Sequence, residues 1–226
     1  MRLGLLGGSF NPIHGCHLSI AQSARHLLQL DQVLFIPTGD PPHKQPGTLA
    51  AAQHRFRMVQ LAVQDEPAFA LTDIEIRRSG KSYSIDTVRA LQEEYGPDTA
   101  LFFIIGLDAF LDLPSWKSAA QLLTLCHFIV ISRPSTTFLS VASLPLFPEI
   151  PKEELLALDA GRLERADIPL RNGRTVTFLR LPPCESSASD IRARVANGRP
   201  LANLLPPLVE SYILREGLYR EDSERF

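Results

Sequence analysis

The chain has 226 residues, 45% of them hydrophobic and 21% charged, and its formal net charge is -2 at pH 7. This composition is typical of a globular protein with one sizeable core, and the near-neutral charge argues against nucleic acid or an anionic membrane surface as a partner. The 3 cysteines are widely spaced, which argues against a disulfide framework and a CxxC metal motif. No apolar run reaches the roughly 18 residues of a membrane span and none has the features of a signal peptide, so we expect a cytoplasmic protein.

Short apolar runs alternate along the chain with segments of helical periodicity. Strands are predicted at residues 2–6, 33–37, 69–76, 100–105, 127–131 and 176–181. Helices are predicted at residues 17–30, 53–63 and 84–95, the second with Phe56, Val59, Leu61 and Val63 on one side. Apolar strands that alternate with helices indicate a parallel sheet covered on both faces. The fold class is therefore α/β, a doubly wound Rossmann-like sheet whose ligands bind at the carboxyl ends of the strands.

The pattern loosens between residues 134 and 171, where prolines 134, 145, 148 and 151 interrupt regular elements. The polar residues 152–167 predict one exposed helix. We interpret 134–171 as an insertion or lid-like excursion within a single domain that spans residues 1–226. The tail, residues 189–226, is predicted to be helical, with two helices over 189–219 broken at Pro206-Pro207.

A run of glycines and histidines, GGSFNPIHGCH at positions 7–17, lies between the first predicted strand and the first predicted helix. Glycines allow the backbone to approach a ligand closely, and His14 and His17 fall on one face of the helix start. Together with the positive helix end they predict a polyphosphate site. Two alternatives remain open here. One is an ordinary turn with two surface histidines, and the other is a metal site built from His14, Cys16 and His17.

This run resembles the GxFxPxHxGH signature of the HxGH nucleotidyltransferase superfamily. Further segments resemble one branch of it, the bacterial nicotinate-nucleotide adenylyltransferases, and occur in the same order along nearly the whole chain. They are PTGDPPHK (37–44), SYSIDT (82–87), FIIGLDAFLDLPSW (103–116), SRP (132–134), SSASDIR (186–192) and LLPPLVESYILREGLY (204–219).

The resemblance implies a reaction. The 5′-phosphate of nicotinate mononucleotide attacks the α-phosphate of ATP and pyrophosphate leaves, which gives nicotinate adenine dinucleotide on the route to NAD. No covalent intermediate with the enzyme is implied, so catalysis would depend on positioning and on stabilisation of charge. The one implied cofactor is Mg²⁺, held mainly by the ATP phosphates and water rather than by a protein metal site.

The resemblance also implies roles for residues that match its motifs. Catalytic roles fall to His14, His17, Lys44 and Arg192, with His17 the stronger candidate for stabilising the transition state. Ser187, Ser189 and Arg192 would grip the β- and γ-phosphates, although Ser189 also suits an ordinary helix N-cap. The full set implied to bind ATP is Gly8, Ser9, Phe10, His14, His17, Gly106, Asp108, Ser187, Ser189 and Arg192.

A second set is implied to bind the pyridine nucleotide. Trp116, the chain's 1 tryptophan, would stack on the pyridine ring, and its alternative role is core packing beside Leu113. Backbone N–H groups near Ser84 and Lys117 would receive the nicotinate carboxylate. The full set is Lys44, Ser84, Asp108, Trp116, Lys117 and Arg133, in which Lys44 and Arg133 supply cations for the phosphate and Asp108 holds a ribose hydroxyl or orients the site.

The chain departs from the signature at three places. Cys16 occupies the position of the motif glycine, Asn11 replaces the usual acidic residue, and Ala188 interrupts the hydroxyls of the tail motif. A thiol at a helix start beside histidines is predicted to be reactive. We therefore expect a thiol reagent to inactivate the protein and ATP to protect it.

Other functions remain to be weighed. Within the same chemistry the acceptor could be nicotinamide mononucleotide or phosphopantetheine, or the nucleotide could be CTP. Cys16 and Asn11 also suggest a non-catalytic nucleotide-binding module, against which the joint presence of His14, His17, Lys44 and Arg192 argues. The sequence leaves open whether the protein forms a homo-oligomer.

Overall fold

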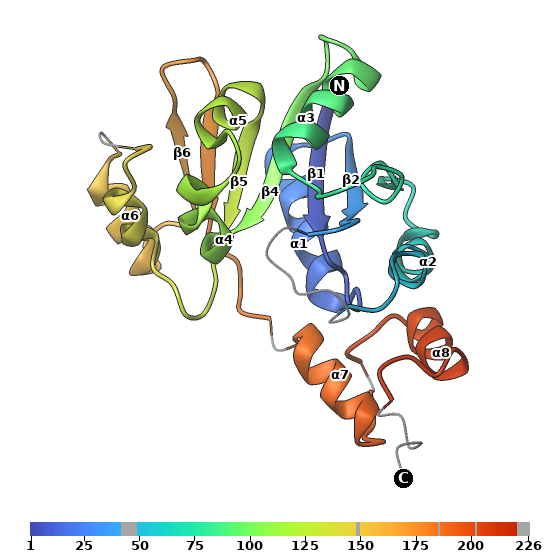
Figure 1. Ribbon diagram of the computed structural model, residues 1–226. Coiled ribbons are helices and arrows are strands. Elements are labelled where there is room, and N and C mark those ends of the chain that lie inside the picture. Colours follow the sequence, from blue (N-terminus) through green and yellow to red (C-terminus); the bar gives the residue numbers. More distant parts are fainter. Residues whose placement is uncertain (42–48, 148–149, 185, 202, 221–226) are drawn as a thin grey trace.

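The computed structural model describes residues 1–41, 49–147, 150–184, 186–201 and 203–220. Its centre is a seven-stranded sheet with the order β3-β2-β1-β4-β5-β7-β6 (Figure 1). All neighbouring strands are parallel except β6 and β7, which are antiparallel. The strands are β1 (Arg2–Gly8), β2 (Gln32–Pro37), β3 (Phe69–Leu71), β4 (Ala100–Gly106), β5 (His127–Ile131), β6 (Arg165–Pro169) and β7 (Thr175–Leu179).

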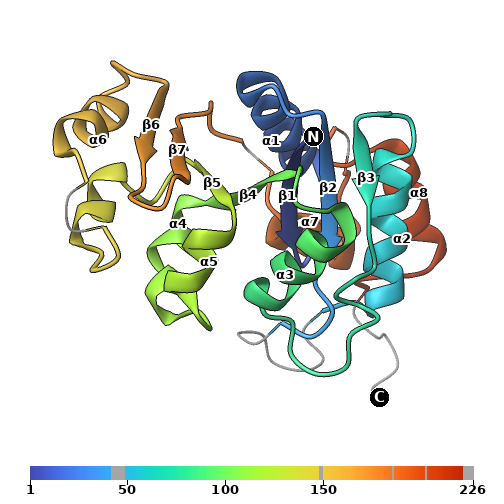
Figure 2. The ribbon, with the colours of Figure 1, turned by 90° about the horizontal axis from the view of Figure 1, so that it is seen from above.

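Helices cover both faces of this sheet. They are α1 (Gly15–Leu28), α2 (Ala52–Val63), α3 (Ser84–Tyr95), α4 (Leu107–Leu111), α5 (Ala119–Leu125), α6 (Lys152–Asp159), α7 (Ala188–Ala196) and α8 (Pro207–Arg215), with 3₁₀ turns η1 (Leu113–Ser115) and η2 (Phe138–Ser143). Figure 2 shows α1 on one side of the sheet and α3, α4 and α5 on the other. Residues of β1 divide accordingly: Leu3 and Leu5 join one buried cluster and Leu6 joins the other.

Burial on both faces explains the continuous apolar runs. In β2 every residue after Gln32 is buried, and in β4 the residues between Ala100 and Gly106 are buried. A strand with one solvated face would alternate apolar and polar residues instead. The predicted fold class is confirmed.

The strand order reverses between β1 and β4. From β1 the chain moves outward to β2 and β3, and it then returns to place β4 on the other side of β1. At such a switch point the connections leave in opposite directions and open a crevice at the carboxyl ends of the strands. Gly7 and Gly8 end β1 and Gly106 ends β4, so the predicted glycine-rich site lies at this crevice.

The prediction of one exposed helix over residues 152–167 is wrong. Helix α6 ends at Asp159, and residues Arg165–Pro169 form the edge strand β6. Gly161, with a φ of 70°, follows the helix in a left-handed conformation that glycine adopts freely. Residues Leu155 and Leu158 are fully buried, and β6 alternates buried and exposed residues as a strand does.

Three other predicted elements differ in detail. β3 ends at Leu71, so the predicted strand over 69–76 is too long. Helix α2 buries Val59 and Val63 of the predicted apolar side, but with Arg55 and Met58 in place of Phe56 and Leu61, because positions 55, 58, 59 and 63 share one helical face. In the tail, α7 ends at Ala196 and α8 begins at Pro207, so this proline begins a helix rather than interrupting one.

Among the described residues, every helix is too short or too polar to cross a lipid bilayer.

Candidate active site

One hollow lies where β1 passes into α1, and its volume is about 260 Å³. The residues that line it come from the β1–α1 loop, the chain before α2 and the start of α7. They are Ser9, Phe10, Asn11, His14, His17, Leu49, Ala188 and Arg192. We call it the phosphate hollow, after the ligand that the sequence predicts there. Five of the residues predicted to bind ATP therefore meet here, although they come from opposite ends of the chain.

The two histidines have a fixed arrangement at the start of α1. His14 is the N-cap residue, and its backbone N–H donates to Nδ1 of His17 over 3.2 Å. Because Nδ1 of His17 accepts this bond, the neutral ring carries its proton on Nε2. The two ring centroids are 4.0 Å apart. Nδ1 of His14 is buried and has no hydrogen-bond partner among the described residues, so it is available to a ligand.

Both histidines are uncharged at neutral pH. Burial, followed by the positive charge of Arg133, lowers the pKa of His14 from 6.5 to about 4. Burial, His14 and Arg133 lower the pKa of His17 from 6.5 to about 3. The ligand-free hollow thus presents neutral imidazoles that can donate hydrogen bonds, rather than imidazolium ions.

The far wall of the hollow is the start of α7. Nη1 of Arg192 donates to the carbonyl oxygen of Asn11 over 2.8 Å. Ser187 is the N-cap residue of α7 and accepts from the backbone N–H of Asp190 at 3.2 Å, so Ser187 rather than Ser189 caps the helix. The hydroxyls of Ser187 and Ser189 share a hydrogen bond of 3.0 Å. Both serines thus stand beside the hollow, and Ala188 between them lines it.

A second hollow of about 200 Å³ begins on the same strand, β1, and we call it the pyridine pocket. Gly7 lines it at the end of β1, and three residues predicted to bind the pyridine nucleotide, Ser84, Trp116 and Lys117, line it as well. The Trp116 ring packs edge-on against Phe103, with centroids 6.2 Å apart, so this residue both packs on the core and lines the pocket.

Buried polar residues that we did not predict form part of this pocket. Oγ1 of Thr87 donates to Oε1 of Glu75 over 2.8 Å, and Nη1 of Arg78 donates to the same hydroxyl over 2.9 Å. Burial raises the pKa of Glu75, and its contacts with Thr87 and Arg78 oppose that shift. Thr87 lies in the SYSIDT segment that carried the resemblance, whereas nothing in the local sequence distinguishes Glu75 from a surface carboxylate.

Asp108 and Arg133 line neither hollow but face one another across the switch point. Nε of Arg133 lies 3.4 Å from Oδ1 of Asp108. Gly106 permits this approach, because a Cβ atom there would stand 2.5 Å from the Asp108 carboxylate and 2.6 Å from the Arg133 guanidinium. The pKa shifts of His14 and His17 show that the Arg133 charge acts on the phosphate hollow. Gly106 is also the N-cap residue of α4, so Asp108 is not the cap.

Arg55 is the main residue that sequence reasoning missed. Its side chain is buried, with 2% exposed, and donates to the carbonyl oxygens of Ser9 at 2.8 Å, Ala50 at 2.9 Å and Gly39 at 3.3 Å. It therefore ties the chain beside the phosphate hollow to the chain beside the pyridine pocket. Helical periodicity was the available signal, since Arg55 shares a face with Met58.

Asn11 also has a structural explanation. Its Oδ1 accepts from the backbone N–H of Ala50 at 3.0 Å and from the hydroxyl of Tyr219 at 2.8 Å. A neutral amide oxygen serves both donors without adding a negative charge to the hollow. Lys44 lies outside the described residues.

The predicted free thiol at Cys16 is contradicted, because Cys16 forms a disulfide with Cys184. The expectation failed because the two residues are 168 positions apart and only the tertiary fold brings them together. A disulfide sulfur does not serve as a thiolate ligand, and the described residues contain no group of three or more His, Cys, Asp or Glu side chains suited to a metal. The third cysteine, Cys126, is free and buried.

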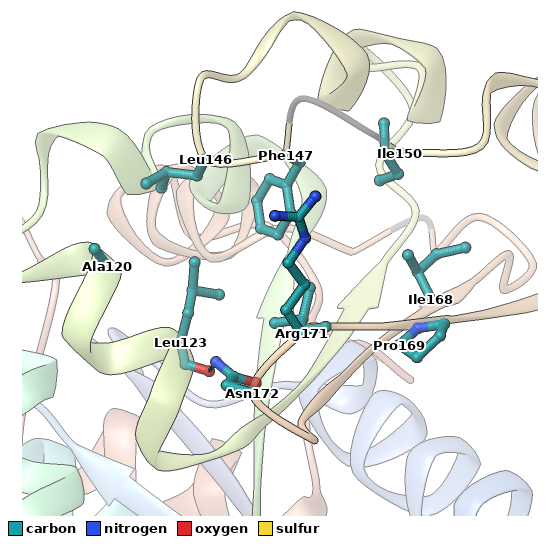
Figure 3. Close-up of a pocket in the computed structure, with 10 residues that line it drawn as sticks. Ala120, Leu123, Leu146, Phe147, Ile150, Ile168, Pro169, Arg171 and Asn172 are labelled. Carbon is teal, nitrogen blue, oxygen red and sulfur yellow. Dashed lines mark hydrogen bonds between the residues drawn. The ribbon is translucent and has the colours of Figure 1, made fainter.

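A further hollow of about 470 Å³ lies between α5 and the β6–β7 hairpin (Figure 3). Apolar side chains such as Leu123, Phe147 and Ile168 line it, with Arg171 and Asn172 beside them. None of its lining residues belongs to the predicted site. We therefore place the site at the switch point.

Comparison with known proteins identifies the family of the chain. The cytidylyltransferase-like family matches residues 5–194. The chain is 45% identical over 221 residues to the probable nicotinate-nucleotide adenylyltransferase of Citrifermentans bemidjiense, covering 97% of this chain and 98% of that protein. It is 37% identical over 226 residues to the corresponding Thermoanaerobacter protein, covering 99% and 97%. The fold is similar to that of Plasmodium falciparum nicotinic acid mononucleotide adenylyltransferase complexed with NaAD, with a TM-score of 0.70 and 19% identity over 96% of this chain and 97% of that one.

Proposed function

This chain belongs to the nicotinate-nucleotide adenylyltransferase family, and we propose that its two hollows hold the two substrates of that reaction. The enzyme transfers the adenylyl group of ATP to nicotinate mononucleotide and releases pyrophosphate, a step of NAD biosynthesis. The observation that carries the assignment of sites is the position of the hollows. Both begin at the carboxyl end of β1, so a triphosphate in one and a mononucleotide in the other would meet at the switch point.

The phosphate hollow suits ATP because its histidine donors are neutral and His17 is already oriented. Nε2–H of His17 is held by the bond that Nδ1 accepts from the His14 backbone. A donor of this kind gains strength as negative charge grows on the phosphoryl oxygens in the transition state. Arg192, at the opposite wall, would add a charged donor to the leaving pyrophosphate.

The pyridine pocket suits nicotinate mononucleotide. Trp116 offers an aromatic face for the pyridine ring, and the backbone at Ser84 and Lys117 would receive the carboxylate. Nζ of Lys117 is paired with Asp86 at 2.8 Å, which leaves its backbone N–H as the proposed contact. Arg133 and Lys44 would attract the 5′-phosphate toward the α-phosphate of ATP.

We also propose that Mg²⁺ enters with ATP. The described residues that line the phosphate hollow include no carboxylate, so the phosphates and water would supply the oxygen ligands that this ion prefers. The ion would neutralise charge on the β- and γ-phosphates.

The cytoplasm, where ATP is abundant, is the proposed location of the protein. Assembly into a homo-oligomer stays a prediction.

Pyrophosphate release tests the assignment. ATP and Mg²⁺ are supplied with nicotinate mononucleotide, with its amide or with phosphopantetheine, and we expect turnover with the acid. The variant His17→Ala should lose about 10²–10³-fold in kcat, the effect of removing one transition-state donor. His26→Ala, an exposed histidine of the same helix, is the matched control. Turnover with the amide or phosphopantetheine alone would contradict the acceptor, and an unchanged kcat for His17→Ala would contradict the role of this histidine.

A further inference from the structure

The disulfide joins the two walls of the phosphate hollow. Cys16 lies in the first turn of α1, between His14 and His17, and Cys184 lies in the chain that leads from β7 to α7. Their Cα atoms are 5.8 Å apart, inside the roughly 4.4–6.8 Å usual for this bond. Neither cysteine lines the hollow itself, but Cys16 stands between its lining residues His14 and His17, and Cys184 shortly precedes Ala188 in the chain. Disulfides of intracellular proteins are usually transient and serve catalysis or redox sensing.

We propose that Cys16–Cys184 is a thiol–disulfide exchange site, opened by a dithiol reductant, that sets the affinity of the enzyme for ATP. The inference rests on the proposed placement of ATP in the phosphate hollow. It concerns a covalent modification of the site rather than the transfer reaction itself.

Exposure determines where exchange begins. Cys184 is exposed at the surface, whereas only 3% of Cys16 is exposed. A thiolate of the reductant therefore attacks the sulfur of Cys184, and the Cys16 sulfur leaves as a thiolate. The second thiol of the reductant then displaces Cys184, so one disulfide is reduced and the dithiol is oxidised by the same two electrons. Each released thiolate takes up a proton from the solvent, and a small-molecule disulfide reverses the process.

The surroundings of Cys16 favour it as the leaving group. The helix dipole of α1 stabilises a negative charge in its first turn. The hydroxyl oxygen of Ser186 lies 3.1 Å from the Cys16 sulfur, close enough for the hydroxyl to donate to a thiolate, whereas the carbonyl oxygen of Ser186, also at 3.1 Å, opposes a negative charge there. These features are absent around Cys126, which is buried among apolar residues.

The donors near the link explain the direction of the effect. With the bond closed, Arg192 donates to the carbonyl of Asn11, and the hydroxyls of Ser187 and Ser189 bond to one another. Arg192 keeps further N–H donors for phosphate, but turning them and the serine hydroxyls toward a ligand requires this chain to move, and the tether restrains it. Reduction removes that restraint, so the reduced enzyme should bind ATP more tightly. The pyridine pocket contains no residue of this segment among its described lining, so affinity for nicotinate mononucleotide should not change.

The test compares enzyme treated with a dithiol and enzyme treated with a small-molecule disulfide. Alkylation of the denatured protein followed by mass measurement should count one thiol after oxidation and 3 after reduction, the number of cysteines in the chain. Calorimetric titration with a non-hydrolysable ATP analogue should give a Kd at least about fivefold lower for the reduced enzyme. The KM for nicotinate mononucleotide should agree within about twofold between the two forms.

Two variants make the result decisive. Cys184→Ser should show the reduced Kd under both treatments, whereas Cys126→Ala should keep the redox response. A thiol count that never falls below 3, or an oxidised enzyme that binds the analogue as tightly as the reduced one, would overturn the proposal. Because the Kd is measured without turnover, failure of the redox effect is distinguishable from failure of the proposed reaction, which the acceptor assay detects separately.

Discussion

Acidification should destabilise the ligand-free enzyme through the two histidines of the phosphate hollow. The folded chain holds the pKa of His14 at about 4 and that of His17 at about 3, both below the ordinary 6.5. Between pH 6.5 and about 4 the unfolded chain binds protons that the folded chain does not, so stability is complete above pH 6.5 and falls as the pH drops. One pH unit corresponds to about 1.4 kcal/mol for each group.

The magnitude follows from that slope. Lowering the pH from 6.5 to 5 should remove about 2 kcal/mol for each histidine, a large share of the about 5–15 kcal/mol that stabilises a typical domain. Urea unfolding at pH 7 and pH 5, followed by the fluorescence of Trp116, measures the change in the free energy of unfolding. The variant His17→Gln cannot take up the proton and should lose about 2 kcal/mol less than the native protein over this interval.

The control is His26→Gln, which changes an exposed histidine in the last turn of α1. It should keep the full pH dependence of the native protein. If His17→Gln and the native protein lost the same free energy between pH 7 and pH 5, the reasoning from burial would be refuted. The histidine would then accept its proton in the folded state, and the hollow would be cationic rather than neutral.

Three further substitutions test other parts of the site. Arg55→Lys keeps the charge, but a single ammonium group cannot replace the guanidinium at three carbonyl oxygens. Urea unfolding should therefore show a free energy of unfolding about 2–3 kcal/mol lower, and a decrease below about 0.5 kcal/mol would contradict this role. Trp116→Ala should raise the KM for nicotinate mononucleotide about 10–100-fold, because it removes a stacking surface. The KM for ATP should stay within about twofold of the native value, and equal increases in both KM values would indicate a general structural defect. Thr87→Val has nearly the same shape but removes one buried donor to the Glu75 carboxylate, so the free energy of unfolding should fall by about 1–3 kcal/mol. An unchanged midpoint in urea would show that this bond contributes nothing.

Elements whose pattern reflects their burial could be predicted from the sequence. The strands β1, β2, β4 and β5 are continuous apolar runs because both faces of the sheet are covered, and α3 matches its predicted bounds. The region 152–167 failed for a related reason. Its helix and its edge strand are both partly exposed, so polar residues dominate and obscure the change of period from 3.6 to 2 at Gly161.

The same distinction between local patterns and long-range contacts applies to the residues of the candidate site. Residues that a local motif predicts to contact a ligand, such as His14, His17 and Trp116, line the two hollows. Residues that act across the fold could not be predicted, because their partners are far away in the sequence. Arg55 reaches Ser9 across 46 positions, and the disulfide partner of Cys16 is 168 positions away.

The neutral state of the two histidines bears both on the stability of the protein and on the chemistry of the site. Two imidazolium ions would repel one another and the nearby Arg133 guanidinium. Burial and the Arg133 charge instead keep both rings uncharged. The rings still have N–H donors, and the His14–His17 bond determines which nitrogen of His17 carries its proton. Bound phosphates would reverse the sign of the local field, so that each donor strengthens in the complex and most in the transition state, where the negative charge is greatest. The same burial that makes the ligand-free protein sensitive to acid therefore prepares these residues for phosphoryl chemistry.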